Sequence, residues 1–223
     1  MTSRIFAAHQ PIFLPNLDFF SKMAQVDQFV LADDLQYSKH CQINRCRIKG
    51  VDGAHWLTVP VRTKGRGFQK IKDVQIIDES GWRQSHWKTI HVCYKKSAYF
   101  EKYIDFFAGV YNQKWRFLID LNMACIAFIR QALEIQTPLT KTSELDVHST
   151  ATARIVEISK KTGSTEYLCE QKYREILDEK MFAEAGIALN FYEPRQPAYH
   201  QLFSAFVPGL SIIDLLFNEG DEA

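Results

Sequence analysis

The chain has 223 residues, and its 27 Lys and Arg side chains nearly balance its 26 Asp and Glu side chains. This balance provides no global attraction to nucleic acid or to an anionic membrane, so we expect no DNA partner. The five cysteines are an odd number without dense spacing, and the N-terminus lacks the pattern of a signal peptide. No apolar run approaches the roughly 20 residues that cross a bilayer. We therefore expect a soluble, cytoplasmic protein with reduced thiols and no membrane insertion.

The first part of the chain predicts a strand, a loop, a helix and a second strand. Residues 4–8 are an apolar strand candidate, and residues 17–24 place apolar side chains at helical spacing after Asn16, which stands at the N-cap position. The apolar run within residues 28–32 suits a buried parallel strand. Apolar residues on both sides of an Asp-Gly turn at 52–53 predict a hairpin.

Helices are expected to dominate the middle of the chain. Residues 74–77 form a short strand candidate, whereas residues 81–111 lack helix breakers and predict helices on both sides of Ser97. Residues 115–134 carry apolar side chains three and four positions apart and give the clearest helix of the sequence. Cys125 belongs to that apolar face, so we expect it to be a core thiol.

Short strands and helices alternate after Pro138. The expected elements are a strand at 139–145, a helix at 152–162, a strand at 166–168, a helix at 173–185, a strand at 188–192 and a last apolar helix at 211–217. This alternation predicts a mostly parallel sheet with flanking helices. We predict an α/β fold of the Rossmann-like, doubly wound class with a small hairpin and a helical insertion. A single domain over residues 1–223, with a helical subregion around 81–135, is the expected organisation.

His9 and Gln10 directly follow the first predicted strand, a position where α/β proteins habitually bind ligands. An imidazole at this position could serve as a general base. Pro11 and Pro15 restrict the backbone of the loop and would hold its polar groups in one shape. The alternative is a histidine that only bonds the backbone at the end of a strand.

Polar residues also follow the second predicted strand. Asp33 and Asp34 could orient the histidine, receive a proton or form a solvated turn, but they provide too few ligands for a metal site, and none is predicted. In an extended segment Gln42 and Asn44 would share one face beside Arg45, where they could grip a carboxylate or sugar hydroxyls. A polar strand edge explains the same pattern.

Residues 62–70 hold four cations and two glycines and predict a mobile basic loop. Lys64 and Arg66 are its candidates for anion binding. Cys41 and Cys46 lie near arginines, whose charge would lower the pKa of a thiol and favour a nucleophilic thiolate. Inert thiols are the alternative for both cysteines.

The C-terminal part contains a second stiffened polar segment before a helix, and Tyr199 and Gln201 lie in it. Ser211 is a natural N-cap for the last helix. Asp214 occupies the capping-box position three residues later. Both residues therefore have a local structural explanation besides a functional one.

Several separated blocks resemble the WbqC-like protein family in identity and order. They are His9-Gln10-Pro11-x-x-Leu14-Pro15, Asp33-Asp34-x-Gln36, Asn44-Arg45, Trp56-Leu57-Thr58-Val59-Pro60-Val61, Trp82, Tyr167-Leu168, Tyr199-x-Gln201 and Phe206-x-Pro208-x-Leu210-Ser211-Ile212-x-Asp214. The resemblance extends from residue 5 to Gly220. It implies a transferase of bacterial surface polysaccharide (O-antigen) biosynthesis that acylates an amino sugar or attaches a glycyl-type group to it.

The resemblance also implies a set of site residues. The positions that match are His9, Gln10, Asp33, Asp34, Gln36, Asn44, Arg45, Trp56, Thr58, Tyr199, Gln201 and Asp214. Their partners would be a sugar or other small-molecule substrate and an acyl or aminoacyl donor, and the sequence specifies no cofactor.

Two classes of function fit these residues. In an enzyme, His9 would be the base, Asp33 or Asp34 would hold its tautomer, and polar groups of the 42–45 segment would stabilise a tetrahedral oxyanion. In the alternative, a non-catalytic binding or scaffold protein of a polysaccharide assembly system, the same blocks would form a surface. Nucleotidyl transfer also fits the strand-loop-helix opening, but the chain lacks a Gly-rich fingerprint.

Overall fold

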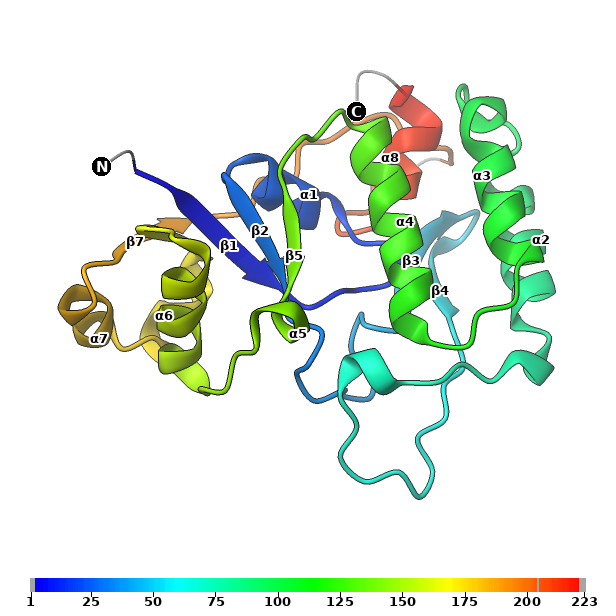
Figure 1. Cartoon of the computed structure of the whole chain (residues 1–223). Coiled ribbons are helices and arrows are strands. Elements are labelled where there is room, and N and C mark those ends of the chain that lie inside the picture. The colour runs from blue at the N-terminus through cyan, green and yellow to red at the C-terminus, as the bar shows by residue number, and fades with distance from the viewer. Residues whose placement is uncertain (1–2, 204, 221–223) are drawn as a thin grey trace. The chain divides into compact units, whose positions relative to one another are not determined.

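The computed structural model describes residues 3–203 and 205–220 (Figure 1). The backbone divides into two compact units, each assembled from three segments of the chain. The first unit contains Met1–Gln10, Asp18–Asp34 and Ile135–Arg195. The second contains Pro11–Leu17, Leu35–Glu134 and Gln196–Ala223.

The first unit is built on a five-stranded sheet in the order β5-β2-β1-β6-β7, and its four strand pairs are all parallel. The strands are β1 (Ile5–His9), β2 (Gln28–Leu31), β5 (Leu139–Lys141), β6 (Glu166–Glu170) and β7 (Ala188–Tyr192). The prediction of an α/β fold with a parallel sheet is confirmed. The order reverses between β1 and β6, which is the position where doubly wound sheets bind ligands at the carboxyl ends of their strands.

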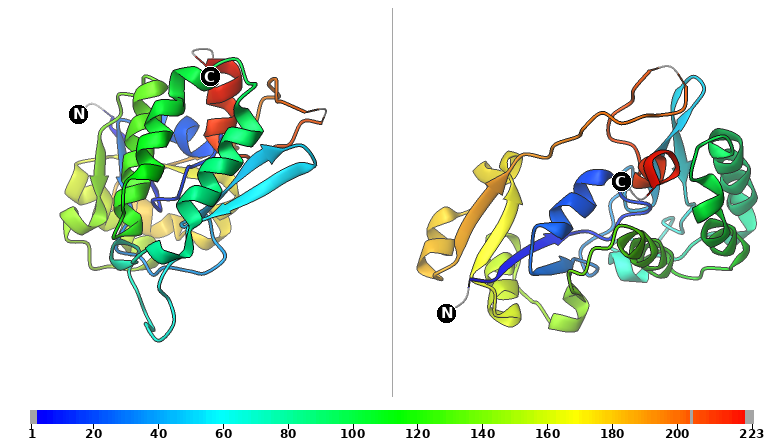
Figure 2. Two further views of the ribbon diagram at one scale, coloured as in Figure 1. Left: turned by 90° about the vertical axis from the view of Figure 1, so that its right-hand side faces the viewer. Right: turned by 90° about the horizontal axis from the view of Figure 1, so that it is seen from above.

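Helices cover both faces of this sheet. They are α1 (Leu17–Ala24), α5 (Thr142–Leu145), α6 (Ala151–Thr162), the 3-10 helix η3 (Gln171–Ile176) and α7 (Glu179–Glu184). Figure 2 shows α1 and α6 on opposite faces. On one face Phe6 packs into a core with Val156 of α6 and Phe182 of α7, and on the other Phe19 of α1 meets Phe29 with ring centroids 5.1 Å apart.

Two element predictions in this unit were wrong. The helix expected at 173–185 is broken into η3 and α7, because Asp178 caps the second piece by accepting a hydrogen bond from the Met181 amide at 3.1 Å. The strand expected at 139–145 ends at Lys141, and the chain continues directly as α5. The strand at 188–192 and the helix at 17–24 have the expected bounds.

The second unit combines an antiparallel hairpin with helices. Its elements are β3 (Arg45–Gly50), β4 (Gly53–Thr58), the 3-10 helices η1 (Ile71–Asp73) and η2 (Asp78–Ser80), and the helices α2 (Trp82–Tyr94), α3 (Phe100–Asn112), α4 (Leu118–Ala132) and α8 (Ile212–Glu219). The hairpin, the helices on both sides of Ser97 and the last helix are confirmed, and Cys125 is fully buried as expected.

The last helix lies in the centre of the second unit. Residues 212–218 are all buried, and α8 packs against α3 and β3. The ring of Phe217 meets Tyr94, Phe100 and Phe107 with centroid distances of 5.0, 5.3 and 5.5 Å. The last apolar helix predicted from the sequence is therefore part of the core of this unit.

Residues 74–77 do not form the predicted strand. Instead, Ile76 makes an isolated bridge with Val61, and Gln75 makes another with Phe117. Single bridges to two different segments leave no partner for a continuous ladder. Within residues 3–203 and 205–220, no helix has both the length and the apolar character needed to span a bilayer.

Candidate active site

The carboxyl ends of β1 and β2 bring His9 and Asp33 to one edge of the first unit. His9 pairs with Leu31 across the two strands, and its carbonyl accepts a hydrogen bond from the Ala32 amide at 2.9 Å. Parallel pairing fixes this edge, because both chains leave the sheet in the same direction. The first predicted site segment and the Asp33-Asp34 pair are thus neighbours in the fold.

His9 is held in one orientation. Its Nδ1 lies 2.8 Å from the Gln10 carbonyl, to which it donates, and its ring packs edge-on against Phe19 with centroids 5.1 Å apart. Burial, assisted by the charge of Lys22, lowers the pKa of His9 from 6.5 to about 4. The imidazole is therefore neutral at physiological pH, with the proton on Nδ1 and the lone pair on Nε2.

Asp33 and Asp34 do not hold the His9 tautomer, and that part of the prediction was wrong. Asp33 is buried and accepts hydrogen bonds from the Ser143 amide at 2.9 Å and the Ser143 hydroxyl at 2.6 Å. Asp34 forms an ion pair with Arg154 and accepts a hydrogen bond from Thr142. The two carboxylates tie the end of β2 to α5 and α6, which leaves the Gln10 carbonyl to fix the histidine.

Two charged residues that sequence reasoning missed surround His9. Lys22 lies on α1 with only 4% of its surface exposed, and burial lowers the pKa of its ammonium. Glu170 ends β6, is 7% exposed and forms an ion pair with Lys172. Both influence the pKa of His9. The three side chains therefore form one electrostatic cluster at the reversal point of the sheet.

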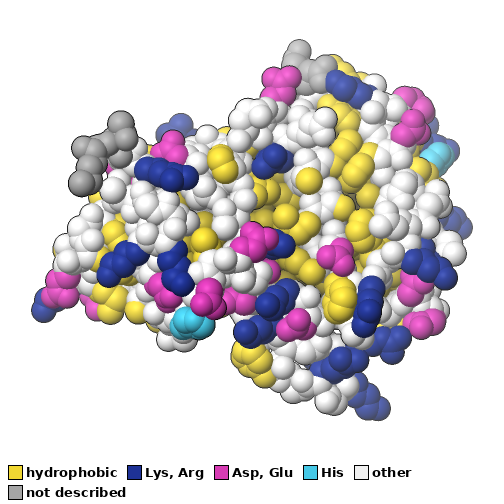
Figure 3. Space-filling model, in the orientation of Figure 1, with side chains coloured by type: hydrophobic (Ala, Val, Ile, Leu, Met, Phe, Trp, Pro, Cys, Tyr) yellow, Lys and Arg dark blue, Asp and Glu magenta, His cyan; other side chains and the backbone are white. Residues whose placement is uncertain are grey.

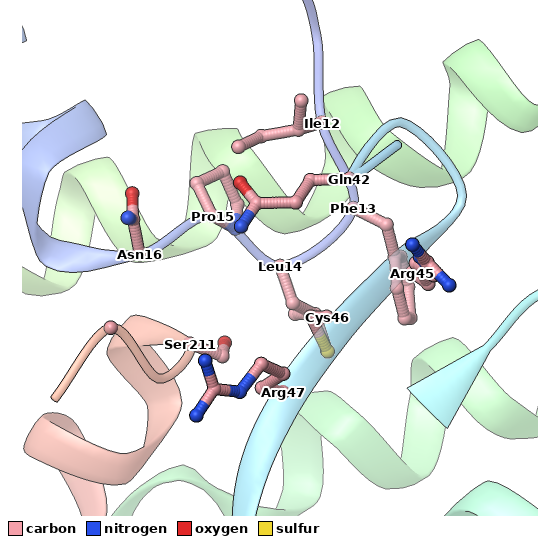
Figure 4. Close-up of a pocket in the computed structure, with 11 residues that line it drawn as sticks. Ile12, Phe13, Leu14, Pro15, Asn16, Gln42, Arg45, Cys46, Arg47 and Ser211 are labelled. Atoms are coloured by element: carbon pink, nitrogen blue, oxygen red, sulfur yellow. The ribbon is translucent and has the colours of Figure 1, made fainter. Parts of the chain in front are cut away.

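In the second unit, several predicted residues line a small cavity. Gln42, Arg45, Cys46 and Arg47 surround it together with Ser211 (Figure 4). Its volume is about 10 Å³, room for about one water molecule. Burial raises the pKa of the Cys46 thiol, so the prediction that nearby arginines favour a thiolate was wrong for this cysteine.

The segment before β3 is a turn and not an extended strand. Asn44 is buried, and its amide donates a hydrogen bond to the Val59 carbonyl at 2.8 Å. Gln42 is exposed, so the two side chains do not share one face as predicted. Arg45 lies over the ring of Trp56, 4.2 Å from its centroid, and bonds the His40 carbonyl.

Asp214 is fully buried and joins two tyrosines. It accepts hydrogen bonds from Tyr94 at 2.9 Å and from Tyr199 at 2.7 Å, while the Tyr94 hydroxyl accepts one from the Lys49 amide at 2.8 Å. Burial raises the pKa of the Asp214 carboxyl. The capping-box explanation of Asp214 was wrong, whereas Ser211 does cap α8 through the Ile213 amide.

We expect Asp214→Ala to lower the free energy of unfolding by about 2 to 3 kcal/mol, because it leaves the buried hydroxyl of Tyr94 and the partly buried hydroxyl of Tyr199 without their acceptor. Tyr199→Phe removes one bond and should cost about 1 kcal/mol. Urea unfolding monitored by circular dichroism measures both values, and Asp105→Ala on the exposed side of α3 is the control. Equal effects of the Asp214 and Asp105 substitutions would contradict the network.

The remaining predicted residues also belong to the second unit. Thr58 ends β4 and is exposed, and the Gln201 side chain holds both the amide and the carbonyl of Val207, at 2.8 and 3.0 Å. Gln36 bridges to Lys70 at the base of the basic loop that carries Lys64 and Arg66. The predicted site residues therefore lie in separate places. Some belong to the His9 cluster of the first unit, and the others lie in the second unit around the small cavity, in the Asp214 network or at the basic loop.

The comparisons with known proteins decide the family. The model of the WbqC-like protein family matches residues 10–223. The chain belongs to this family. A protein of Mycobacterium tuberculosis, "Uncharacterized protein Rv1507c", is 34% identical over 216 residues, which cover 96% of this chain and 93% of that protein. No solved structure matches the chain.

Lys22 gives this WbqC-like protein an unusual buried charge. Its side chain is only 4% exposed, and the carboxylate of Glu170 is the charge that most favours its ammonium form. Moving a charge out of water costs folding free energy that such an attraction offsets only in part. The sequence does contain a signal for it, since Lys22 lies three positions after Phe19 and next to Met23 on the apolar face of α1.

We expect Lys22→Met to raise the free energy of unfolding by about 1 to 2 kcal/mol, because an apolar chain of similar length replaces a lysine that burial keeps largely out of water. The pKa of His9, measured by NMR titration of its ring protons, should rise because a neighbouring positive charge is lost. Lys180→Met, at an exposed position of α7, is the control for urea unfolding. A clear loss of stability in Lys22→Met would show that the ammonium is paired.

Proposed function

We propose that this WbqC-like protein is a transferase of bacterial surface polysaccharide biosynthesis that acylates or aminoacylates the amine of an amino sugar. The family resemblance supports the pathway, because WbqC-like proteins are associated mainly with surface polysaccharide gene clusters. The state of His9 supports the chemistry. Its neutral imidazole, with Nδ1–H bonded to the Gln10 carbonyl and Nε2 available as an acceptor, is the observation on which the proposal rests.

The reaction that we propose is acyl transfer to nitrogen. The amine of the sugar forms a bond to the acyl carbonyl carbon, and the bond from that carbon to the leaving group of the donor breaks with its electron pair. The proton released from nitrogen passes to Nε2 of His9 and then to the leaving group. Positioning of the two substrates beside this base provides most of the remaining catalysis.

Lys22 would couple substrate binding to the strength of the base. After burial, the positive charge of Lys22 is the largest cause that lowers the pKa of His9. An anionic group of a substrate placed against this ammonium would offset the charge and raise the pKa of His9. A base that is weak in the free protein would thus become stronger once the substrate is bound. Asp33 and Asp34 act as positioning residues through their bonds to α5 and α6.

A transfer assay tests the proposal. The purified protein is incubated with UDP- and dTDP-linked amino sugars and with acyl-coenzyme A or aminoacyl-tRNA donors, and the products are analysed by mass spectrometry. We expect an amide product whose mass equals that of the sugar plus the acyl group minus one hydrogen. Binding of an amino sugar without turnover by any donor would instead support the alternative, a non-catalytic binding or scaffold protein.

A further inference from the structure

The basic loop of the second unit concentrates positive charge that the rest of the chain does not have. Between Arg62 and Lys72 there are five cations and no acid, although the whole chain has a net charge of only +1. Figure 3 shows several Lys and Arg side chains close together on the surface where Figure 1 draws this loop. The charge is therefore local and is suited to an anion with few negative groups.

The loop also forms a concave surface. A hollow of about 440 Å³ is lined by Val61, Arg62, Thr63, Lys64, Arg66 and Ile77. This volume lies in the range of small-molecule sites, about 300 to 1,000 Å³. The loop turns at Gly65 and Gly67, whose φ angles of 71° and 53° are readily adopted by glycine.

Backbone hydrogen bonds fix both ends of the loop. The Tyr37 amide bonds the Gln69 carbonyl at 2.8 Å, and the Ile71 amide bonds the Leu35 carbonyl at 2.9 Å. At the other end, the Arg62 amide bonds the Gln75 carbonyl at 2.8 Å. The hollow thus has a fixed base beneath an exposed tip.

The cationic side chains of the loop have few partners within the protein. Arg62 lies 3.4 Å from Glu79, and Arg66 lies 3.3 Å from the side-chain oxygen of Gln75, both at exposed positions. Within the described part of the chain, Lys64 has no acidic partner. These charges are free to meet a ligand, because exposed pairs of this kind contribute little stability.

Phe68 adds a flat apolar group to the same loop. Its side chain is 65% exposed, although an aromatic ring of this size is usually buried. A cationic surface that also presents an exposed aromatic ring binds phosphates through the cations and stacks a nucleobase on the ring. Neither feature alone points to a nucleotide, but the combination of the two on one loop fits the phosphates and the base of one.

We propose that the loop Arg62–Lys72 binds a nucleoside diphosphate, with Arg62, Lys64 and Arg66 on the phosphates and Phe68 against the base. The volume of the hollow and the near-neutral charge of the chain favour one nucleotide over a single-stranded nucleic acid. The role of this nucleotide as the carrier of an activated amino sugar is an inference that rests on the proposed function. Binding of the nucleoside diphosphate itself does not depend on it.

Isothermal titration calorimetry on the full chain tests this site with UDP, dTDP, GDP and inorganic pyrophosphate. We expect one of the nucleotides to bind, and K64Q and R66Q to weaken both that nucleotide and pyrophosphate by about tenfold each, since each removes a charge-assisted contact. Phe68→Ala should weaken the nucleotide by at least about fivefold and leave pyrophosphate unchanged, because only the base stacks. The controls on α2, Lys88→Gln and Val92→Ala, should have no effect.

Three results would overturn the proposal. They are the absence of binding by all three nucleotides at millimolar concentration, affinities that none of the loop variants changes, and tighter binding of a 12-nucleotide single-stranded DNA than of any nucleotide. Failure of acyl transfer with intact nucleotide binding would refute the proposed function alone. Circular dichroism of each variant verifies that the chain is folded.

Discussion

The free energy of unfolding is expected to fall steeply as the pH drops from 6.5 toward 4, because one partly buried and one buried histidine are neutral in the folded chain. Burial lowers the pKa of His9 and of His86 from 6.5 to about 4. In this interval the unfolded chain binds a proton at each site that the folded chain does not, so stability is complete above pH 6.5 and is lost as the pH falls. At about 1.4 kcal/mol per pH unit, each histidine contributes about 3 kcal/mol.

The structural cause for His86 is clear. Its side chain is 6% exposed, its Nε2 donates to the Thr58 carbonyl at 3.1 Å, and its Nδ1 has no hydrogen-bond partner. Protonation of Nδ1 would create a buried charge and a buried N–H without an acceptor. The rings of Trp82 and Tyr111, with centroids 5.1 and 5.8 Å from that of His86, leave little room for water.

Urea unfolding between pH 4 and 7.5 measures this dependence. His9→Asn and His86→Gln should each reduce the slope by about 1.4 kcal/mol per pH unit, whereas His148→Asn, at an exposed position, should not. His9 lies in the first unit and His86 in the second. Hydrogen exchange measured for separate peptides should therefore assign the loss of stability caused by each histidine to its own unit. A stability that stays constant from pH 6.5 to 4.5 would contradict the lowered pKa values of both histidines.

Replacement of His9 is expected to reduce the rate of acyl transfer by about 100- to 10,000-fold, the range typical of a lost general base. His9→Asn is the sharpest variant, because its amide can keep the hydrogen bond to the Gln10 carbonyl while Nε2 is removed. We expect kcat to fall and the stability above pH 6.5 to change little. His148→Asn is again the matched control.

The pH profile separates this role from a structural one. Because the pKa of His9 in the free protein is about 4, kcat/KM should lack the inflection near 6.5 that an ordinary histidine produces. In Lys22→Met the pKa of His9 should rise, and the inflection should move to higher pH. Wild-type rates in His9→Asn would rule out the imidazole as the base.

The sequence predicted the sheet well because its information is local. Largely apolar runs such as 28–31 indicate buried strands directly, and so does the alternation of short strands and helices after Pro138. The hydrophobic periodicity of a segment can be read without knowing how the segment packs. Residues 74–77 failed because a short apolar run does not reveal whether a neighbour can pair along its whole length. The helix expected at 173–185 failed because one capping residue, Asp178, outweighed the helical propensity of its surroundings.

The candidate site was only partly predictable. His9 could be found because it follows a strand within a recognisable motif, but Lys22 looks like an ordinary surface lysine unless the apolar face of its helix is traced. Glu170 belongs to the same cluster although it lies 161 residues after His9. One partner of Asp214, Tyr199, lies 15 residues before it, but the other, Tyr94, lies 120 residues before it, and no spacing rule connects Tyr94 to Asp214.

The order of the strands has a consequence for the way in which the chain folds during synthesis. β2 pairs with β5 across 110 residues, as Phe29 with Leu139, and β1 pairs with β6 across 161, as Ile5 with Glu166. The hairpin and the helices α2 to α4 leave the ribosome earlier, but β3, α2 and α3 pack on α8 at the far end of the chain. The central strands β1 and β2 must therefore wait with unpaired edges, and contacts of such long sequence separation slow folding. The second unit waits in turn for α8, which follows all five strands of the sheet in the chain. We expect nascent chains that end before residue 139 to complete neither unit and to depend on chaperones.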